Sequence, residues 1–335
     1  MKAAIFDGRE IQIKEIPKPI LNDTQVLIQV KAAGICGTDL AIVNGHLSVP
    51  IPLILGHEFS GIVVDIGKKV NPDWLKKRVT SEINSNIDFS CFFCQRDITS
   101  QCESRKALGI DINGSFAEFI AVDSYLLHEL PDNISYREAT FIEPLAAAYQ
   151  TFETMPLGSD DKTMVIFGLG KLGLLLCQVA VIKGLEVIGI DHSDRKLNLA
   201  KNFGVKHLIK NNEEKSLAGR IKKITGNLGA DIVVDTTGNP NVLKEIISSC
   251  RSRGKIHIKS THGIDTPINL TDIVVREITI YSSRCGPFHK AIDGLSSGLI
   301  NVKDLISKEF KLENIADAFN SYKKSRDHIK TIILI

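Results

Sequence analysis

Residues 164–173 read Met-Val-Ile-Phe-Gly-Leu-Gly-Lys-Leu-Gly, an apolar run that passes directly into a glycine-rich turn and then into an apolar helix pattern. The turn comprises Gly168, Leu169, Gly170, Lys171, Leu172 and Gly173. In this context the first glycine permits a tight turn, the second lets the backbone approach a pyrophosphate, and the third allows close helix packing. The N-terminus of the helix also favours the negative charge of phosphates. The stretch therefore predicts a dinucleotide-binding unit.

The next strand pattern, residues 187–190, ends in Asp191, eighteen residues after Gly173. An acidic residue at this place accepts hydrogen bonds from the adenosine ribose and repels a 2′-phosphate, so NAD is favoured over NADP. Arg195 would bind such a phosphate only if its loop folded back, and on a helix we expect it to face solvent. Thr237 follows a further strand pattern and is expected to contact the cofactor, because ligands gather outside the carboxyl ends of parallel strands.

Two glycine-framed turns upstream carry residues that suit a metal ion. Cys36 lies in Gly-Ile-Cys-Gly-Thr-Asp at residues 34–39, and His57 lies in Gly-His-Glu at residues 56–58. Thiolate and imidazole are suitable ligands for zinc, and a catalytic zinc needs three protein ligands and one open position. Glu143, a carboxylate in an apolar stretch, and Glu58, beside His57, compete for the third place. Alone, Cys36 would be interpreted as a small buried apolar residue and His57 as a hydrogen-bonded core histidine.

A second metal signature occupies fifteen residues, with the spacing Asp88-x2-Cys91-x2-Cys94-x7-Cys102. Four ligands in one loop-like segment are typical of a closed structural zinc site. A carboxylate in the first place departs from the usual Cys or Cys/His sets, although zinc chemistry permits it. The alternatives are a former site with three free thiols and, less favoured, a disulfide.

The composition limits the class of protein. The chain has 335 residues, 43% of them hydrophobic, which predicts two domains with substantial cores. A net charge of +2 with scattered basic residues gives no electrostatic reason to expect nucleic-acid or membrane binding. No secretory signal and no membrane-spanning run is predicted. Four of the seven cysteines lie in metal-like settings, which favours a reducing cytoplasm over a disulfide framework.

The pattern of apolar residues changes along the chain. The first third alternates short strand patterns with Gly, Pro and Asn turns, which predicts a mostly antiparallel β module. From about residue 162 strand patterns alternate with amphipathic helix patterns, which predicts a doubly wound parallel sheet. From about residue 288 helix patterns return, and residues 329–335 again resemble a strand. We therefore expect an α/β protein whose domain boundary lies at this change of pattern, near residue 162.

Taken together, these motifs resemble the zinc-containing medium-chain dehydrogenases, a family that includes alcohol, sorbitol, threonine and archaeal glucose dehydrogenases. The resemblance extends over nearly the whole chain, and the motifs that carry it are residues 34–39, 56–61, 88–102, 114–118, 143–145 and 168–173. It implies a GroES-like catalytic domain formed by residues 1–147 and 286–335, a Rossmann domain at residues 148–285, and a homodimer or homotetramer. Glu-Pro-Leu at residues 143–145 is similar to the sorbitol and glucose dehydrogenase branch.

The resemblance also implies a reaction: oxidation of a secondary alcohol, polyol or sugar, with zinc lowering the pKa of the substrate hydroxyl and hydride passing to the nicotinamide. Thr38 would accept the hydroxyl proton. Ala41 replaces a relay histidine found in many members, so water, Glu58 or His46 would complete the path. Arg284 is similar to an arginine near the nicotinamide in polyol dehydrogenases.

Two alternative functions remain open at this stage. A zinc-free quinone reductase of the same superfamily would lack the paired turns and the cysteine-rich segment. A nucleotide-binding protein without turnover would keep the fold, which by itself does not establish activity.

Overall fold

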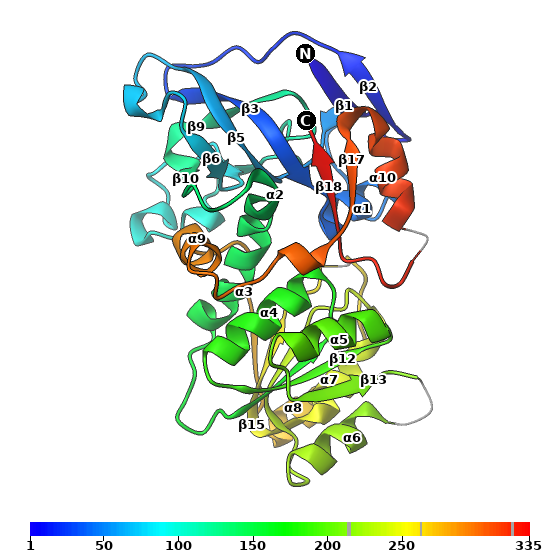
Figure 1. Cartoon of the computed structure of the whole chain (residues 1–335). Coiled ribbons are helices and arrows are strands. Elements are labelled where there is room, and N and C mark those ends of the chain that lie inside the picture. The colour runs from blue at the N-terminus through cyan, green and yellow to red at the C-terminus, as the bar shows by residue number, and fades with distance from the viewer. Residues whose placement is uncertain (213–215, 262, 323–324) are drawn as a thin grey trace.

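The computed structural model describes residues 1–212, 216–261, 263–322 and 325–335, which form two lobes stacked end to end (Figure 1). The upper lobe is built on a mostly antiparallel sheet and contains both chain ends. The lower lobe is built on a parallel sheet with helices packed around it. This arrangement confirms the predicted fold class, a GroES-like β domain combined with a Rossmann-type α/β domain.

The main sheet of the upper lobe has the strand order β10-β6-β5-β3-β18-β17, with β9 pairing with β3 off this path. These strands are β3 (Gln25–Gly34), β5 (Glu58–Ile66), β6 (Arg78–Ser81), β9 (Phe119–Asp123), β10 (Leu127–Glu129), β17 (Ile306–Lys311) and β18 (Lys330–Leu334). The C-terminal strand β18 therefore pairs antiparallel with β3 from the start of the chain. The pair β17–β18 is parallel, which the sequence did not predict.

Smaller elements complete the upper lobe. They are β1 (Lys2–Phe6), β2 (Ile11–Glu15), β4 (Leu53–Ile54), β7 (Asn84–Ser85), β8 (Lys106–Ala107), α1 (Gly37–Val43), α2 (Tyr136–Ala139) and α10 (Ile315–Tyr322). The strands β2, β1 and β4 form a sheet of their own, and β7 pairs with β8 at the base of the segment that holds Asp88 and the three cysteines. That segment projects from the lobe as a loop with two short 3-10 turns.

The parallel sheet of the lower lobe has the order β13-β12-β11-β14-β15-β16, and all its pairings are parallel. The strands are β11 (Thr163–Phe167), β12 (Glu186–Asp191), β13 (His207–Lys210), β14 (Ala230–Asp235), β15 (Cys250–Ile258) and β16 (Thr279–Ser282). This is the 3-2-1-4-5-6 order of a dinucleotide-binding fold, in which the strand order reverses between β11 and β14. A ligand crevice is expected at that point.

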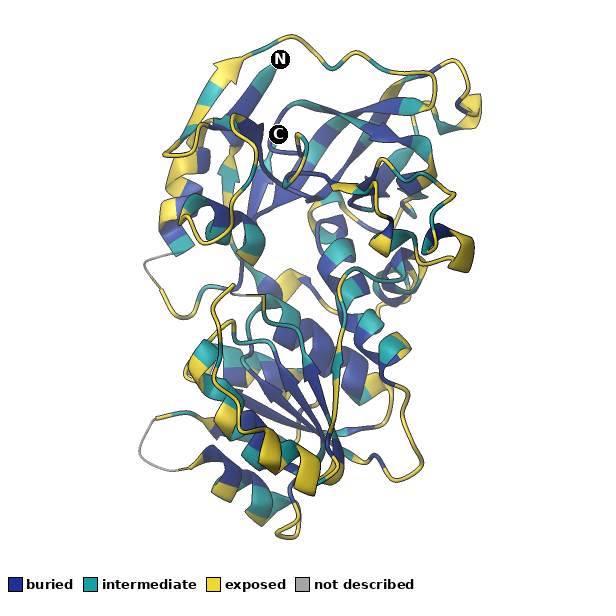
Figure 2. Ribbon diagram, turned by 180° about the vertical axis from the view of Figure 1, so that it is seen from behind, coloured by how far each residue is buried: buried dark blue, intermediate teal, exposed yellow. Residues whose placement is uncertain are grey.

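The helices of the parallel lobe are α4 (Lys171–Ile182), α5 (Asp194–Asn202), α6 (Leu217–Ile224), α7 (Leu243–Ser249) and α8 (Leu270–Val275). Two further helices, α3 (Ile142–Thr154) and α9 (Phe288–Ser296), lie at the junction of the lobes (Figure 1). Ser193 caps α5 by accepting a hydrogen bond from the Lys196 backbone, as its position in the sequence predicts. In Figure 2 the central strands are buried, whereas exposed residues gather on the outer helices and loops. No helix among the described residues is long and apolar enough to cross a membrane.

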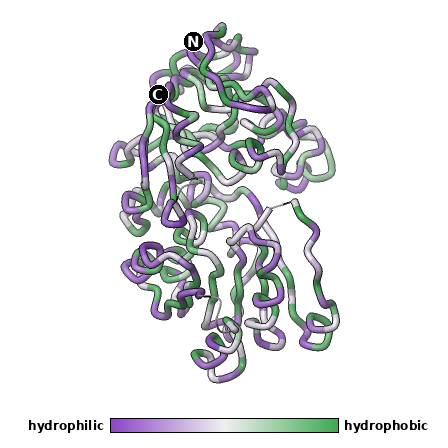
Figure 3. The backbone as a smooth tube through the Cα atoms, turned by 90° about the vertical axis from the view of Figure 1, so that its right-hand side faces the viewer, coloured by the Kyte–Doolittle hydropathy of each residue, from purple (hydrophilic) through white to green (hydrophobic). Residues whose placement is uncertain are grey.

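A continuous apolar core joins the two lobes. Leu145 and Phe152 of α3 belong to the same buried cluster as Leu174 of α4, and that cluster also contains Ala32 of β3 and Ile332 of β18. Hydrophobic and hydrophilic stretches alternate along the chain in both lobes (Figure 3). Because α3 packs against both sheets, it fixes the position of one lobe relative to the other, and residues from both lobes can line one cavity.

Candidate functional site

The two glycine-framed turns lie side by side because β3 and β5 are paired antiparallel. Gly34, at the end of β3, is the register partner of Glu58, the first residue of β5. Cys36 directly precedes α1, and His57 directly precedes β5. One candidate ligand atom from each of Cys36, His57 and Glu58 lies within 4.8 Å of the other two. The structure therefore brings Cys36 close to residues that lie 21 and 22 positions later in the sequence.

Asp39 connects the two turns of this cluster through hydrogen bonds to their backbones. It is fully buried, and its carboxylate accepts hydrogen bonds from the Cys36 backbone at 2.7 Å and from the Gly56 backbone at 3.3 Å. His57 Nδ1 lies 3.7 Å from Asp39 Oδ1 and has no hydrogen-bond partner in the described part of the chain. Although burial disfavours the imidazolium, Asp39 and Cys36 raise the pKa of His57 to about 10. The groups around His57 thus favour a positive charge at this place.

Glu58 is fully buried between two ammonium groups. Lys171 pairs with Oε1 and Lys330 with Oε2, and Lys330 also donates to the Thr140 carbonyl at 3.3 Å. Burial opposes ionisation of Glu58, but the two lysines outweigh it and lower its pKa to about 2. A Cβ at Gly34 would overlap the ammonium group of Lys330, so a larger residue there would displace the Lys330 side chain.

Glu143 lies in the first turn of α3 and lines the same cavity as the cluster. Within the described residues its carboxylate makes no hydrogen bond or ion pair. Burial, and then the nearby charge of Glu58, raise its pKa. An unpaired carboxylate beside a cysteine–histidine cluster fits a metal ion that would compensate its charge. Glu143 is not within the 4.8 Å grouping that Cys36, His57 and Glu58 form.

A cavity of about 450 Å³ lies between the lobes in front of this cluster. Its wall from the antiparallel lobe includes Cys36, Thr38, His57, Glu58 and Glu143. Its wall from the parallel lobe includes Gly170, Lys171, Leu172, Thr236, Lys259, Arg284 and Cys285. The predicted catalytic residues and part of the predicted dinucleotide turn therefore face one space.

A second cavity of about 520 Å³ follows the carboxyl ends of the parallel strands and is lined by Gly168, Gly170, Asp191 and Thr237. Gly168 has a positive φ of 87°, and a Cβ on Gly170 would meet nothing within 4 Å, so the turn leaves room for a ligand. Asp191 accepts backbone hydrogen bonds from Leu169 at 2.7 Å and from Ser193 at 2.9 Å. This crevice has the shape and the glycine turn that a dinucleotide requires.

The predicted cofactor residues Thr237, Arg195 and Arg284 differ in whether they line a cavity, and in which one. Thr237 lines the crevice and its hydroxyl donates to Asp235 at 2.7 Å. Arg195 instead donates to the Ser307 hydroxyl and the Asp327 carbonyl and is not among the crevice-lining residues, so its contact with a cofactor stays a prediction. Arg284 lines the catalytic cavity while donating to the Ser100 carbonyl of the cysteine-rich loop.

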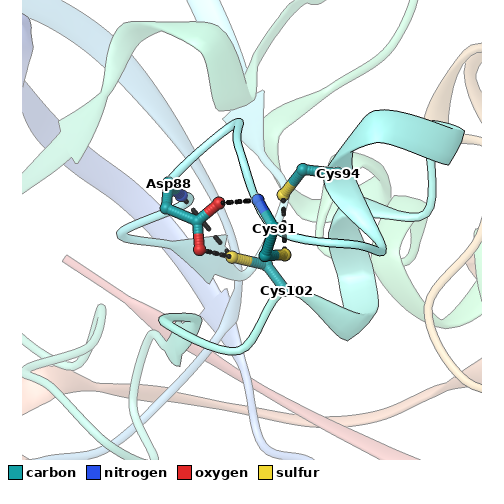
Figure 4. Close-up of side chains that lie close together, drawn as sticks. All are labelled: Asp88, Cys91, Cys94 and Cys102. Atoms are coloured by element: carbon teal, nitrogen blue, oxygen red, sulfur yellow. Dashed lines mark hydrogen bonds between the residues drawn. The ribbon is translucent and has the colours of Figure 1, made fainter.

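The second predicted metal site is assembled in one loop, shown in Figure 4. One ligand atom from each of Asp88, Cys91, Cys94 and Cys102 lies within 4.8 Å of the others. Cys102 Sγ lies 3.2 Å from Asp88 Oδ2, and the sulfurs of Cys91 and Cys94 are 3.5 Å apart. All three cysteines are free thiols in this structure. Three thiols and one carboxylate converging in this way fit a four-coordinate zinc.

Sequence reasoning missed Lys330 and Tyr322, and it predicted Lys171 only as part of the dinucleotide turn. Lys330 is fully buried on the C-terminal strand, and Tyr322 of α10 lines both cavities. The side chain of Lys171 turns from the glycine-rich loop into the catalytic cavity. No local motif marks the first two residues, because their partners lie far away in the chain.

Comparison with known proteins agrees with this geometry. The alcohol dehydrogenase GroES-like domain matches residues 22–132, and the zinc-binding dehydrogenase domain matches residues 172–297. The chain is 31% identical over 327 residues to a sorbitol dehydrogenase of Halalkalibacterium halodurans, covering 96% of this chain and 94% of that protein.

Solved structures extend the similarity to the whole chain. A short chain alcohol dehydrogenase from E. coli CFT073 complexed with NADH has a TM-score of 0.92 at 27% identity, covering 100% of this chain and 99% of the other. A putative zinc-binding dehydrogenase from Sinorhizobium meliloti 1021 bound to NADP has a TM-score of 0.90 at 26% identity, with the same coverage. The chain belongs to the zinc-type medium-chain alcohol dehydrogenase family. In class it is an NAD(P)-dependent alcohol or polyol dehydrogenase.

Proposed function

We propose that this enzyme oxidises a secondary alcohol, polyol or sugar by transferring hydride to NAD. The observation that supports this most directly is that Cys36 and His57 face the same cavity as Gly170 and Leu172 of the dinucleotide turn. A substrate in this space would touch the metal cluster on one side and the nicotinamide end of a bound cofactor on the other.

We assign the holding of a catalytic zinc to Cys36, His57 and Glu143. The ion would supply Lewis-acid activation of the substrate hydroxyl. Asp39, 3.7 Å from His57 Nδ1, orients the imidazole so that Nε2 is the atom available to a metal. Thr38, whose hydroxyl lies 3.8 Å from Cys36 Sγ, is placed to accept the proton that the alcohol releases.

The onward path of that proton differs from the one expected for a relay histidine. Ala41 lies within α1 and has no group that transfers protons. His46 is exposed and does not line the catalytic cavity. Glu58 lines the cavity, but both of its carboxylate oxygens are engaged by lysines. We therefore propose that water carries the proton from Thr38 to solvent.

We further propose that NAD is preferred to NADP. Asp191 lines the crevice at the position expected for the adenosine ribose, and its negative charge would repel a 2′-phosphate. One structural relative holds NADH and another NADP, so the family accommodates both, and the side chain at this position is the natural determinant of the choice.

We propose a catalytic domain formed by residues 1–147 and 286–335 and a coenzyme domain formed by residues 148–285. We also propose that the chain assembles into a homodimer or homotetramer. Support for self-association comes from β16, which is the edge strand of the parallel sheet. Beside it, α8 has no buried residue, and Val274 and Val275 are 73% and 75% exposed. An exposed strand edge with apolar residues beside it is the type of surface that a second subunit covers.

The function is tested by metal analysis together with a substrate screen. We expect about two zinc ions per chain and NAD reduction with at least one member of a panel of sugars, polyols and secondary alcohols. His57→Ala should abolish turnover while NADH binding, followed by fluorescence, is retained. Activity without metal would favour the quinone reductase alternative. Tight NADH binding without turnover on any substrate would favour a nucleotide-binding protein.

A further inference from the structure

Lys171 has a side-chain contact that its place in the dinucleotide turn does not explain. The turn uses its backbone and glycines to receive phosphates. The Lys171 side chain, however, lines the catalytic cavity and not the dinucleotide crevice, and its ammonium group pairs with Glu58 Oε1. The contact spans 113 positions in the sequence and joins the coenzyme lobe to the metal cluster.

Glu58 lies close enough to Cys36 and His57 to bind the same metal ion, but both of its carboxylate oxygens are already paired with lysines. One of its oxygens lies within 4.8 Å of candidate ligand atoms of both Cys36 and His57. Lys171 and Lys330 nevertheless occupy one oxygen each, and the carboxylate has no exposed surface. A carboxylate that is already charge-compensated gains little from a metal ion, whereas a buried carboxylate that lost one partner would need another cation.

Glu143, in contrast to Glu58, has a carboxylate that no described cation pairs with. It lines the same cavity and has no hydrogen-bond or ion-pair partner among the described residues. Because no described cation pairs with its carboxylate, a metal ion in front of it would compensate its charge. Of the two carboxylates, Glu143 is therefore the one whose charge a metal ion would balance.

We propose that Lys171 is a positioning residue that, together with Lys330, holds Glu58 outside the coordination sphere of the catalytic metal. With Glu58 held back, Cys36, His57 and Glu143 would hold the ion and leave one position for substrate. Without Lys171, Glu58 Oε1 would lose its ion-pair partner and would be free to act as an additional ligand at that position. The inference rests on the proposed function, since it assumes that a metal occupies the Cys36–His57 cluster.

The test uses the full-length enzyme loaded with Co2+, whose visible absorption reports the number and type of its ligands. Lys171→Met is expected to alter the Co2+ spectrum of the catalytic site, tighten Co2+ binding by about tenfold or more, and lower turnover by about 10- to 100-fold. Lys171→Arg restores the ion pair and is expected to give the wild-type spectrum. Lys171→Met combined with Glu58→Gln removes the additional ligand and is expected to return the spectrum toward wild type. Subtracting the spectrum of His57→Ala removes the contribution of the cysteine-rich loop.

Lys259→Met is the matched control for charge. Lys259 lines the same cavity but donates to the Ala147 carbonyl and to Ser283, and not to Glu58. Its removal takes one positive charge from the cavity and is expected to leave the Co2+ ligand set unchanged. If Lys171→Met does not fold, Lys171→Gln keeps a hydrogen-bond donor without the charge and serves the same comparison.

The outcomes separate this inference from the proposed function. An unchanged Co2+ spectrum and affinity in Lys171→Met, in a wild-type enzyme that binds Co2+ at the Cys36–His57 cluster and turns over, would overturn the role of Lys171 alone. A wild-type enzyme whose Co2+ spectrum is identical to that of His57→Ala would overturn the catalytic metal site, and the role of Lys171 with it. Equal spectral changes in Lys171→Met and Lys259→Met would attribute the effect to charge and would also overturn the role of Lys171.

Discussion

Replacing Glu58 by Gln is expected to destabilise the fold by about 3 kcal/mol at pH 7. The two lysines lower the pKa of Glu58 from 4.5 to about 2, and each pKa unit corresponds to about 1.4 kcal/mol. Breaking a buried ion pair by removing one partner usually costs about 3–5 kcal/mol, which agrees in size. Glutamine keeps the shape of the side chain but leaves both ammonium groups without a counter-ion.

The assay is urea unfolding in the presence of EDTA, so that metal binding does not contribute. Trp74, the only tryptophan of the chain, packs against the core of the antiparallel lobe, and its fluorescence reports unfolding of the half that contains Glu58. With a slope of about 3 kcal/mol per M, the midpoint should fall by about 1 M. Glu129→Gln is the matched control, because Glu129 pairs with Lys77 at 2.6 Å on the surface and its loss should cost less than about 1 kcal/mol.

The pH dependence has a defined sign. A carboxylate whose pKa is lowered by folding stabilises the protein only while it is ionised, so the contribution of Glu58 is complete above pH 4.5 and is lost as the pH falls toward 2. The difference in stability between wild type and Glu58→Gln should therefore narrow below pH 4.5. Equal midpoints at pH 7, or a difference that stays constant on acidification, would refute the reasoning.

Three further perturbations test other parts of the molecule. Asp191→Ala is expected to weaken NADH binding by about 10- to 100-fold, as for a lost hydrogen bond to a charged group, and to reduce the preference over NADPH; fluorescence titrations with unaltered preference would place cofactor selection elsewhere. Val274→Asp is expected to shift the enzyme toward monomer in sedimentation velocity. The control Ile20→Asp changes a residue that is 94% exposed in the other lobe and should leave assembly unchanged. An intact oligomer in Val274→Asp would exclude the α8 surface as the subunit interface. Cys94→Ser is expected to lose about one zinc per chain and lower the melting temperature while NADH binding persists, and wild-type zinc content would contradict a metal in the cysteine-rich loop.

Local spacing was sufficient to predict much of the fold and both clusters of candidate metal ligands. The strand, glycine turn and following acidic residue lie within residues 164–191, so their geometry follows from one βα unit and the next strand. Asp88 and the three cysteines likewise belong to one loop, and their convergence needs no contact from a distant segment for its prediction. The catalytic pair Cys36 and His57 was recognisable because each lies in a glycine-framed turn.

The surroundings of Glu58 could not be predicted, because its partners are set by tertiary structure. Lys330 is 272 positions away, and it reaches Glu58 only because β18 pairs with β3 beside β5. Sequence reasoning therefore favoured Glu143 as the third ligand but left Glu58 as a competitor. The structure distinguishes them by their partners, since two ammonium groups engage Glu58 and no described residue pairs with Glu143.

These contacts explain why the chain returns to its first sheet after completing the parallel one. The turns at Cys36 and His57 contribute negatively charged groups, of which Asp39 and Glu58 are fully buried. The compensating charges come from two other segments, Lys171 at the start of α4 and Lys330 on the last strand. Burying these carboxylates without cations would be costly. The cluster of Cys36, His57 and Glu58 is therefore electrostatically stable only when α4 and β18 bring their lysines next to it. This cluster and the dinucleotide turn line the same cavity, which is where hydride transfer requires the substrate to lie.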